Sequence, residues 1–228
     1  MMQPSIMLLL LLLPLLFSAP STSTARDFDF FYFVLQWPGS FCDTKKSCCY
    51  PATGKPTADF SIHGLWPNYA DGSYPSNCDR KTPYDSSQIA DLTESLRSQW
   101  PSLACSGGGE STFWKHEWEK HGTCSESVLD QHAYFGAALR LRNRINLLQS
   151  LQDAGIKPDG GSYSLTDISS AIRNGTGFEP KLECNADEGG NQQLYQVSVC
   201  VDAKGERLIE CPVSTTSNCP SRVEFPPF

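Results

Sequence analysis

The sequence predicts an α+β fold, a single domain with a central, largely antiparallel sheet that is packed by helices and stapled by disulfides. Three observations favour this class. Segments with strand character lie near both ends of the chain, segments with helical periodicity lie between them, and ten cysteines are spread along it. The chain has 228 residues, enough for one sizeable core. We therefore expect a single domain over residues 26–228.

The first 25 residues are typical of a cleavable signal peptide (1–25). Residues 6–17 are mostly Leu, a run too short for an ordinary membrane span, and small residues at 23–25 offer a cleavage site. The stretch before the run carries no Lys or Arg, which departs from the usual pattern. No other long apolar run follows, so we expect a secreted chain without membrane association once the signal is removed.

The domain begins with segments whose composition predicts strands. Residues 27–37 are rich in aromatic and β-branched residues and predict a strand. Residues 38–58 contain Pro, Gly and three Cys and indicate a stapled loop, and a second strand is expected at 58–65. Two further strands, at 193–201 and 206–210, are expected to flank a turn near the end of the chain.

The second of these strands carries a histidine near its end. Because side chains alternate along a strand, Ser61 and His63 should face one way, and Phe60 and Ile62 the other. A histidine there, followed by Gly64, fits the floor of an active site. A lone histidine in such a place is more often a hydrogen-bonded structural residue.

The helical segments fill the middle of the sequence. Periodic apolar positions predict a helix over 85–100, capped by its first Asp, and further helices over 113–121 and 128–151. A capping-box pattern begins a helix over 164–173. The glycine run at 107–109 is expected to be a flexible loop, because the Lys and Ser/Thr of a phosphate-binding loop are missing.

The cysteines indicate disulfides in an oxidising compartment. All ten follow the leader, Cys48 and Cys49 are adjacent, and no C-x-x-C pair occurs, so zinc-site spacing is absent. The connectivity stays open from the residues alone. Asn174 begins an Asn-Gly-Thr sequon, a glycosylation site in a secreted chain.

The net charge of −7 limits which partners the protein can bind tightly. An acidic protein repels nucleic acid at long range, so the composition argues against a tight DNA or RNA binder. A turnover enzyme with a local basic cluster is compatible with this charge, because it must release its product.

Two of the four histidines fall in one short segment, 113–124. On a helix, residues three or four apart share a face, which gives one stripe: Phe113, His116, Glu117, Lys120, His121 and Cys124. Taken alone, this helix favours a solvated polar face opposite Trp114 and Trp118. A zinc site would need HExxH, and the pattern here is H-E-x-x-x-H, one residue too long. A catalytic face for phosphate chemistry is the third interpretation.

Two segments together change the balance. FSIHGLWPNY (60–69) and FWKHEWEKHGTC (113–124) resemble the two active-site segments of the ribonuclease T2 family, in the same order and at suitable spacing. The QWPGSFC segment, the cysteine set and the C-terminal strands also resemble the plant, S-like branch, so the resemblance covers essentially the whole mature chain. It implies a monomeric endoribonuclease that acts on single-stranded RNA and not on DNA, with no metal and no cofactor.

The resemblance also assigns the catalytic roles. RNA carries its own nucleophile, the 2′-OH, so cleavage needs a base for that proton and an acid for the leaving 5′-oxygen. His121 would be the base and His63 the acid, and His116 would bind phosphate. Lys120 and Glu117 would stabilise the transition state or tune the histidines. The first product would be a 2′,3′-cyclic phosphate.

Base contacts and disulfide partners are implied in the same way. Trp66 and Tyr74 would stack on one base, which tolerates any base identity. Family members often carry Asp where this chain has Asn68, which leaves the base preference open. Gln36 and Phe113 match positions that contact a second base. The implied disulfides are Cys42–Cys48, Cys49–Cys105, Cys78–Cys124, Cys184–Cys219 and Cys200–Cys211.

Two other functions fit the same fold. A non-catalytic storage or defence protein would have been indicated by loss of His63 or His121, and both are present. Self-incompatibility ribonucleases tend to be basic, whereas this chain is acidic. His132 lies outside both motifs and is expected to be a structural or surface residue. Secretion leads to the extracellular space, and a vacuolar destination fits the same features.

Overall fold

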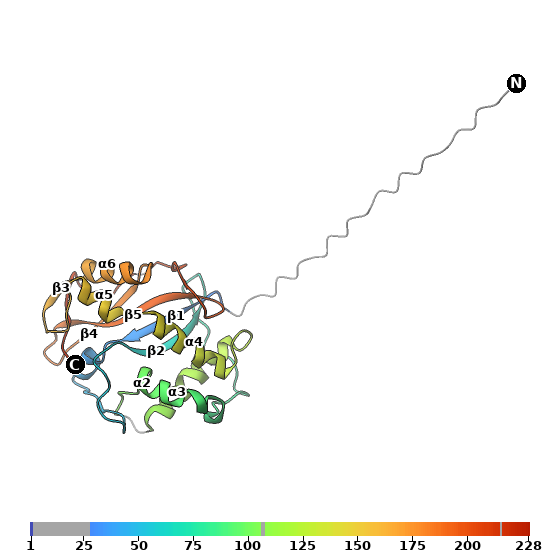
Figure 1. Ribbon diagram of the computed structural model, residues 1–228, viewed down its shortest axis with the longest axis horizontal. Helices are drawn as coiled ribbons and strands as arrows, with labels where there is room; N and C mark the ends of the chain where they lie inside the picture. The colour runs from blue at the N-terminus through green and yellow to red at the C-terminus, as the bar shows by residue number, and fades with distance from the viewer. Residues whose placement is uncertain (2–27, 106–107, 215) are drawn as a thin grey trace.

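A seven-stranded sheet forms the centre of the molecule (Figure 1). The computed structural model describes residues 28–105, 108–214 and 216–228 together with Met1. The signal peptide expected at 1–25 therefore lies outside the described residues, Met1 excepted. The sheet order is β2-β1-β5-β7-β3, and β4 and β6 also pair with β5. The strands are β1 (Phe30–Gln36), β2 (Ser61–Asn68), β3 (Ser162–Ser164), β4 (Lys181–Ala186), β5 (Gln192–Asp202), β6 (Leu208–Ile209) and β7 (Arg222–Glu224).

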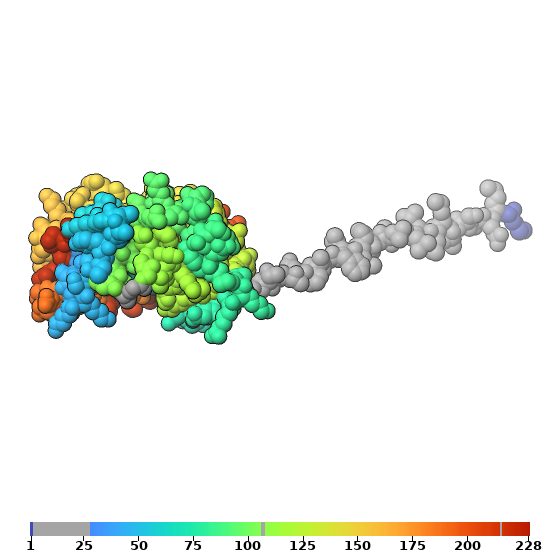
Figure 2. Space-filling model, turned by 90° about the horizontal axis from the view of Figure 1, so that it is seen from below, coloured from blue at the N-terminus to red at the C-terminus, as the bar shows by residue number. Residues whose placement is uncertain are grey.

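All strand pairs are antiparallel except β5 with β7, and helices pack around them, so the α+β prediction is confirmed. Figure 1 shows α2 and α3 beside β2, with α5 and α6 at the opposite side of the molecule. Figure 2 views the side on which α2 and α3 lie. No helix among the described residues is long and apolar enough to cross a membrane. The helices are α1 (Pro38–Cys42), η1 (Ser86–Leu92), α2 (Thr93–Gln99), α3 (Gly109–Lys120), η2 (Gly122–Ser125), α4 (Gln131–Arg144), α5 (Leu147–Asp153) and α6 (Leu165–Thr176).

The position of β1 between two other strands explains why its sequence is rich in aromatic residues. Hydrogen-bonded neighbours lie on both sides of it, so its Phe31, Phe33 and Leu35 are fully buried in the main core. Each such side chain contributes roughly 1.5–3 kcal/mol when it leaves water. The even-numbered residues Tyr32 and Gln36 lie on the opposite face, and Tyr32 lines the cavity described below.

A β-bulge interrupts the pairing of β1 with β2. Val34 lies opposite Gly64 and Leu35 opposite Ile62, so His63 is an extra residue with no partner across the ladder. The simple alternation expected for this strand is therefore wrong beyond Ile62. Bulges bend a strand and re-aim the side chain at the extra position. Here the bulge is at the histidine that the sequence singles out.

Two helices differ from the sequence expectation. The helix expected over 85–100 is a 3-10 segment, η1, followed by α2, with a kink where Ile89 has φ −123° and ψ 20°. Asp85 caps it as expected by accepting from the Ser87 N–H at 2.9 Å. The single helix expected over 128–151 is α4 and α5, because Ile145 is extended and Asn146 caps a new helix. The segment expected as a loop at 38–58 contains the short helix α1.

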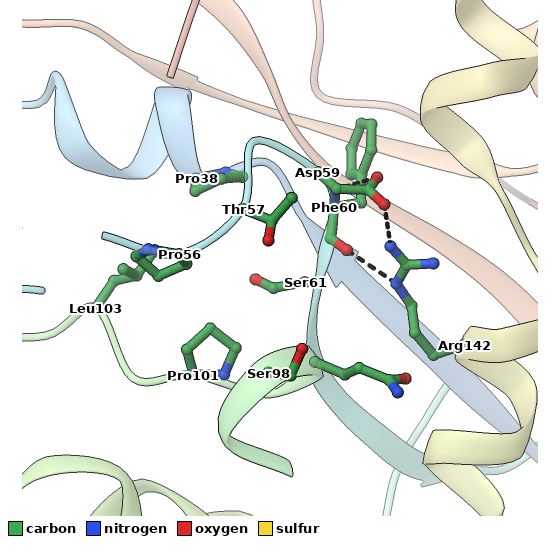
Figure 3. A pocket seen from close by; sticks show the side chains of 11 residues that line it. Pro38, Pro56, Thr57, Asp59, Phe60, Ser61, Ser98, Pro101, Leu103 and Arg142 are labelled. Atoms are coloured by element: carbon green, nitrogen blue, oxygen red, sulfur yellow. Dashed lines mark hydrogen bonds and ion pairs between the residues drawn. The ribbon is translucent and has the colours of Figure 1, made fainter. Parts of the chain in front are cut away.

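An arginine from α4 fixes the chain just before β2 (Figure 3). Arg142 donates from Nε to the Phe60 carbonyl at 2.9 Å and pairs with the Asp59 carboxylate. These two contacts of Arg142 form a clamp on the chain. A small cavity of about 140 Å³ lies beside the clamp, and the Ser61 hydroxyl faces into it. The clamp therefore sets where the strand that carries His63 begins.

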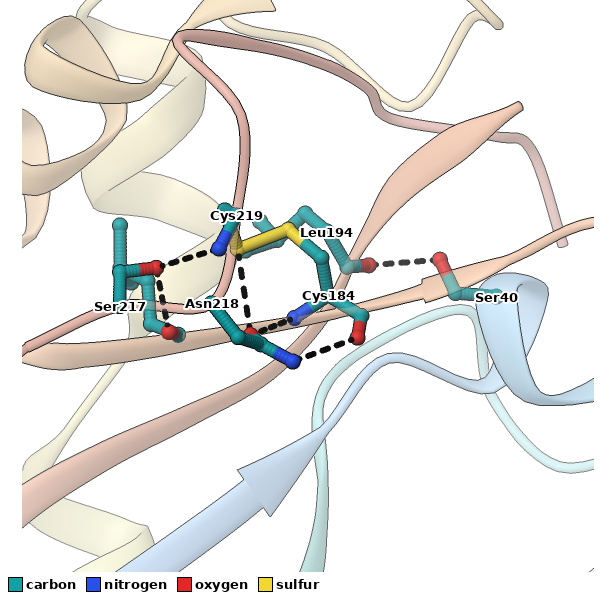
Figure 4. Close-up of a disulfide and its surroundings, with 7 residues drawn as sticks. Ser40, Cys184, Leu194, Ser217, Asn218 and Cys219 are labelled. Carbon is teal, nitrogen blue, oxygen red and sulfur yellow. Dashed lines mark hydrogen bonds between the residues drawn. A yellow bond between two sulfur atoms is a disulfide. The ribbon is translucent and has the colours of Figure 1, made fainter. Parts of the chain in front are cut away.

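Five disulfides staple the fold, and they join the partners that the resemblance implies: Cys42–Cys48, Cys49–Cys105, Cys78–Cys124, Cys184–Cys219 and Cys200–Cys211. Beside the fourth one, residues 217–219 lie along the outer edge of β4 (Figure 4). Asn218 accepts from the Cys184 N–H at 3.0 Å and donates to the Cys184 carbonyl at 3.3 Å, and Ser217 donates to the Leu182 carbonyl at 2.7 Å.

Candidate active site

Most of the residues singled out by the two motifs surround one cavity of about 510 Å³. Eight of the ten predicted catalytic and substrate-binding residues line it: His63, Trp66, Asn68, Tyr74, His116, Glu117, Lys120 and His121. Gln36 and Phe113 do not line it. Phe113 is half-buried with its ring 5.9 Å from that of His63, and Gln36 is buried at the end of β1.

Helix α3 supplies three of these groups from one face, with His121 directly after its end, and it is anchored by its other face. Trp114 donates to the Trp100 carbonyl at 2.9 Å, and Trp118 donates to the Thr82 carbonyl at 3.1 Å. Both indoles are buried, as the solvated-face interpretation expected, while the polar face is turned to the cavity. A polar face that lines the cavity and a core-anchored face are therefore the two sides of the same helix.

The end of α3 is held from several directions. The helix ends at Lys120, whose carbonyl accepts from the Asn77 N–H at 2.8 Å. Cys124, one turn further, is bonded to Cys78. Gly122 allows the chain to pass close to Trp118 after the helix ends, because a Cβ atom there would overlap the Trp118 ring. His121 is consequently fixed at the point where the helix gives way to η2.

His63 projects from the bulge of β2. Its carbonyl accepts from the Trp100 indole at 2.9 Å, and its ring lies edge-on to Trp66 with centroids 5.1 Å apart. The Gln196 side chain from β5 hydrogen-bonds to its Nδ1. Gln196 is a residue that the sequence reasoning missed, because only the strand register brings β5 close to β2.

Trp66 links Glu117 to His121. Its indole N–H donates to Glu117 Oε2 at 2.9 Å, and its ring stacks on that of His121 with centroids 5.0 Å apart and an angle of 23°. Gly64 makes this contact possible, since a Cβ atom there would overlap both the Trp66 indole nitrogen and Glu117 Oε2. The sequence predicts base stacking for Trp66, and the structure adds this role within the protein.

Burial shifts the pKa values of three groups in the cavity: His63, His121 and Glu117. Desolvation, with repulsion from His116 and Lys120, lowers the pKa of His63 to about 4. Desolvation, together with Lys120 and the other histidines, lowers the pKa of His121 to about 3. Burial raises the pKa of Glu117 to about 8, despite the Trp66 hydrogen bond and Lys120, which act in the opposite direction. The cavity thus favours neutral imidazoles and a neutral carboxyl group.

The far wall of the cavity comes from residues that no motif predicted. They are Tyr32, Lys181, Glu183, Ser198, Val213, Ser214 and Thr216. Lys181 forms an ion pair with Glu183 at 2.8 Å, and its Nζ lies 5.5 Å from the Tyr32 ring centroid. Alternation along β1 places Tyr32 on the same face as Gln36, which is the one signal in the sequence for this wall.

The remaining predicted residues lie as follows. Asn68 donates to the Trp66 carbonyl at 2.8 Å, and Tyr74 is 63 % exposed at the rim of the cavity. His132 is on the surface, paired with Asp91 at 3.0 Å, as expected for a residue outside the motifs. Asn174 is exposed near the end of α6. Within the described ranges, no three His, Cys, Asp or Glu side chains gather as metal ligands.

Comparisons with known proteins agree with the geometry. Residues 28–211 match the Ribonuclease T2 family. Ribonuclease 1 of Arabidopsis thaliana is 61 % identical over 220 residues, which cover 96 % of this chain and 95 % of that protein. Extracellular ribonuclease LE of Solanum lycopersicum is 62 % identical over 207 residues, 90 % of each chain.

A solved structure is similar over the same extent. The crystal structure of RNase NT in complex with 5′-AMP superimposes with a TM-score of 0.84 at 54 % identity, covering 89 % of this chain and all of that one. The family match spans more than half of the chain, and the relatives are matched over nearly their whole length. The chain therefore belongs to the ribonuclease T2 family and is a ribonuclease of that family.

Proposed function

We propose that the chain is a secreted, metal-independent endoribonuclease that cleaves single-stranded RNA to 2′,3′-cyclic phosphate products with low base specificity. The observation that carries this proposal is the meeting of two buried imidazoles, an ammonium group and an aromatic face in one cavity. The ten paired cysteines and the relative named as extracellular favour the extracellular space as the destination, with the protein acting as a monomer.

His121 is the general base and His63 the general acid. The lowered pKa of His121 keeps its ring neutral, and thus able to take the 2′-OH proton, even in acid. His63 must carry a proton to protonate the leaving 5′-oxygen. A bound phosphodiester brings negative charge to the His63 ring and so raises its pKa from the low value of the free protein.

Three groups from α3 stabilise the charge that develops on phosphorus oxygens. Lys120 supplies an ammonium group, and His116, which is exposed to the cavity, binds the phosphate. Glu117, with its raised pKa, is protonated near neutrality and can donate a hydrogen bond to a phosphoryl oxygen. No covalent enzyme intermediate is needed, because the nucleophile belongs to the substrate.

The base 5′ to the cleaved bond stacks beside Trp66. The Trp66 ring lines the cavity with His121 stacked on it, and the exposed Tyr74 stands at the rim, so these aromatic rings are the surfaces offered to the base. Stacking accepts every base, which gives low specificity. Asn68, already bonded to the Trp66 carbonyl, positions this platform. Gln36 and Phe113, outside the cavity lining, serve the second base.

Matched oligonucleotides test the proposal. In the presence of excess EDTA, the protein should cleave an all-RNA strand, leave the all-DNA strand intact, and cut a DNA strand with one internal ribonucleotide only on the 3′ side of that nucleotide. The reason is that only the ribonucleotide supplies a 2′-OH. Cleavage of the all-DNA strand at a comparable rate, or loss of activity in EDTA that zinc restores, would contradict it.

A further inference from the structure

The His63 ring has one polar partner in the described part of the chain. Its neighbours Trp66 and Phe113 contact it through their rings, and such contacts leave it free to turn in its own plane. The Gln196 side chain is the group that hydrogen-bonds to Nδ1. Nε2 is thereby the nitrogen that remains for a ligand in the cavity.

Gln196 is firmly placed for this contact. It is 4 % exposed and sits in the middle of β5, opposite Gln36 of β1 on one side and Glu183 of β4 on the other. Neighbouring strands lie about 5 Å apart, so β5 is about 10 Å from β2, with β1 between them. The long side chain of Gln196 spans β1 and reaches the bulged histidine from the sheet itself, whereas the other polar groups around His63 come from α3.

When the imidazolium gives its Nε2 proton to the leaving oxygen, the neutral ring keeps the proton on Nδ1, so Nδ1 is a donor throughout that step and changes role only when the resting ring, with its proton on Nε2, is first protonated. In the neutral ring with the proton on Nε2, Nδ1 is an acceptor, and in the imidazolium it is a donor. A primary amide has both a donor end, Nε2, and an acceptor end, Oε1. By turning its amide, Gln196 can bond to Nδ1 in either state, which neither an apolar side chain nor a carboxylate can do without favouring one of them.

We propose that Gln196 is a positioning residue for the general acid, which holds Nδ1 of His63 in both charge states so that Nε2 stays directed at the leaving oxygen. The proposal rests on the function proposed above. It goes further by placing part of the catalytic apparatus on β5, outside both histidine segments. The charged and titratable groups that also face His63 are His116 and Lys120 of α3 and His121 after its end, and Glu183 is the charged neighbour of Gln196 on β4.

Two substitutions separate positioning from general packing. Gln196→Met keeps the length and removes both ends of the amide. RNA cleavage should fall by about 10–100-fold, while a ribonucleoside 3′-(aryl phosphate), which keeps the 2′-OH nucleophile and has a leaving group that needs little protonation, should be cleaved nearly as well as by the wild type. Gln196→Glu keeps only an acceptor, so the pKa of His63, followed by NMR of its ring protons, should rise by about 1 unit or more.

The matched control is Gln193→Met. Gln193 is also a buried amide of β5, but it bonds to the Ser40 carbonyl and to Asp43, away from the cavity. This variant should keep the wild-type ratio of RNA to aryl-substrate cleavage. The inference is overturned if Gln196→Met leaves that ratio unchanged, or lowers both activities equally as Gln193→Met could, or if Gln196→Glu leaves the His63 titration in place.

The same assays show which idea fails. If His63→Ala itself shows no difference between the two substrates, the assignment of the acid in the proposed function is wrong. If His63→Ala is rescued by the aryl leaving group and Gln196→Met is not, only the role of Gln196 is wrong. Melting curves of all variants identify any loss of fold.

Discussion

The two histidines proposed as acid and base differ in what each must do with a proton, and this can be tested residue by residue. His63→Ala and His121→Ala should each lower kcat/KM on RNA by about 10²–10⁴-fold, the usual contribution of a positioned acid or base. An aryl leaving group should partly rescue His63→Ala and should not rescue His121→Ala. His116→Ala should raise KM as well as lower kcat, because its proposed role includes binding phosphate.

His132→Ala is the control for these variants, since His132 lies on the surface with Asp91 and should keep full activity. Near-normal RNA cleavage by His121→Ala, or rescue of His121→Ala in place of His63→Ala, would show that the roles are assigned wrongly. Circular dichroism of each variant confirms that the fold is retained.

The pH profile follows from the same two residues. In the proposed mechanism, the free enzyme is active when His121, with a pKa of about 3, has lost its proton and His63, with a pKa of about 4, keeps its own. kcat/KM should therefore be highest in acid and fall about tenfold per unit as the pH rises above the pKa of His63. The alkaline limb of kcat should lie at higher pH, since bound phosphate favours the charged ring.

Lys120→Met supplies the check on this assignment. Lys120 lowers the pKa of both histidines, so its removal should move both limbs to higher pH even though the rate itself falls. A profile measured with this variant that keeps the wild-type midpoints would mean that Lys120 does not face the two rings.

At the scale of elements, the bulge in β2 organises the site. Gly64→Ala should separate Trp66 from Glu117, because the added Cβ would overlap atoms of both. Displacing Trp66 removes the ring on which His121 stacks, and we expect kcat/KM to fall at least about tenfold, since small displacements of catalytic groups are costly. Steady-state kinetics and a crystal structure of the variant would measure both effects.

Gly189→Ala is the paired control, because its Cβ would meet only the side chains of Asp187 and Asn191, at 3.3 Å or more. That variant should be as active as the wild type. If Gly64→Ala is equally active, then the contact between Trp66 and Glu117 is not needed for catalysis.

The sequence predicts elements better than it predicts their interruptions. Residues 30–36, with aromatic and β-branched side chains, fix β1, and the cap at Ser164 fixes the start of α6. The bulge at His63 was missed because it depends on pairing with β1, which no local pattern encodes. The break at Asn146 was missed because apolar residues continue past it, although Asn is a good N-cap in the middle of the run.

The same distinction explains which residues of the site the sequence could predict. The groups on α3 are close in sequence, so helical periodicity was enough to bring them together. His63 was joined to them by the resemblance alone. Gln196, Lys181 and Glu183 reach the cavity through strand register, and only the tertiary structure supplies it.

At the scale of the whole molecule, the disulfides should contribute unequally to stability. Cys78–Cys124 closes 46 residues and Cys42–Cys48 closes 6, so chain-entropy arguments assign about 4 and about 2 kcal/mol to them. The double Ser variant of the first pair should melt at the lower temperature. It should also lose activity, because it frees the end of α3, whereas the variant of the second pair should stay active.

Thiol titration of the denatured, unreduced wild type should find no free thiol, in agreement with five pairs. Several free thiols would contradict the framework. Equal melting temperatures for the two double variants would show that native-state strain, and not loop closure, dominates.

The side chains that follow the outer edge of β4 also decide how this protein behaves among its own copies. A bare strand edge is a template on which another chain can add a strand, the first step toward fibres and aggregates. Asn218 and Ser217 use their side chains to occupy hydrogen-bonding groups of Cys184 and Leu182 that such a strand would need, and the Cys184–Cys219 bond keeps them in place. Two small polar residues and one disulfide thus oppose self-templated strand addition at that edge of the sheet.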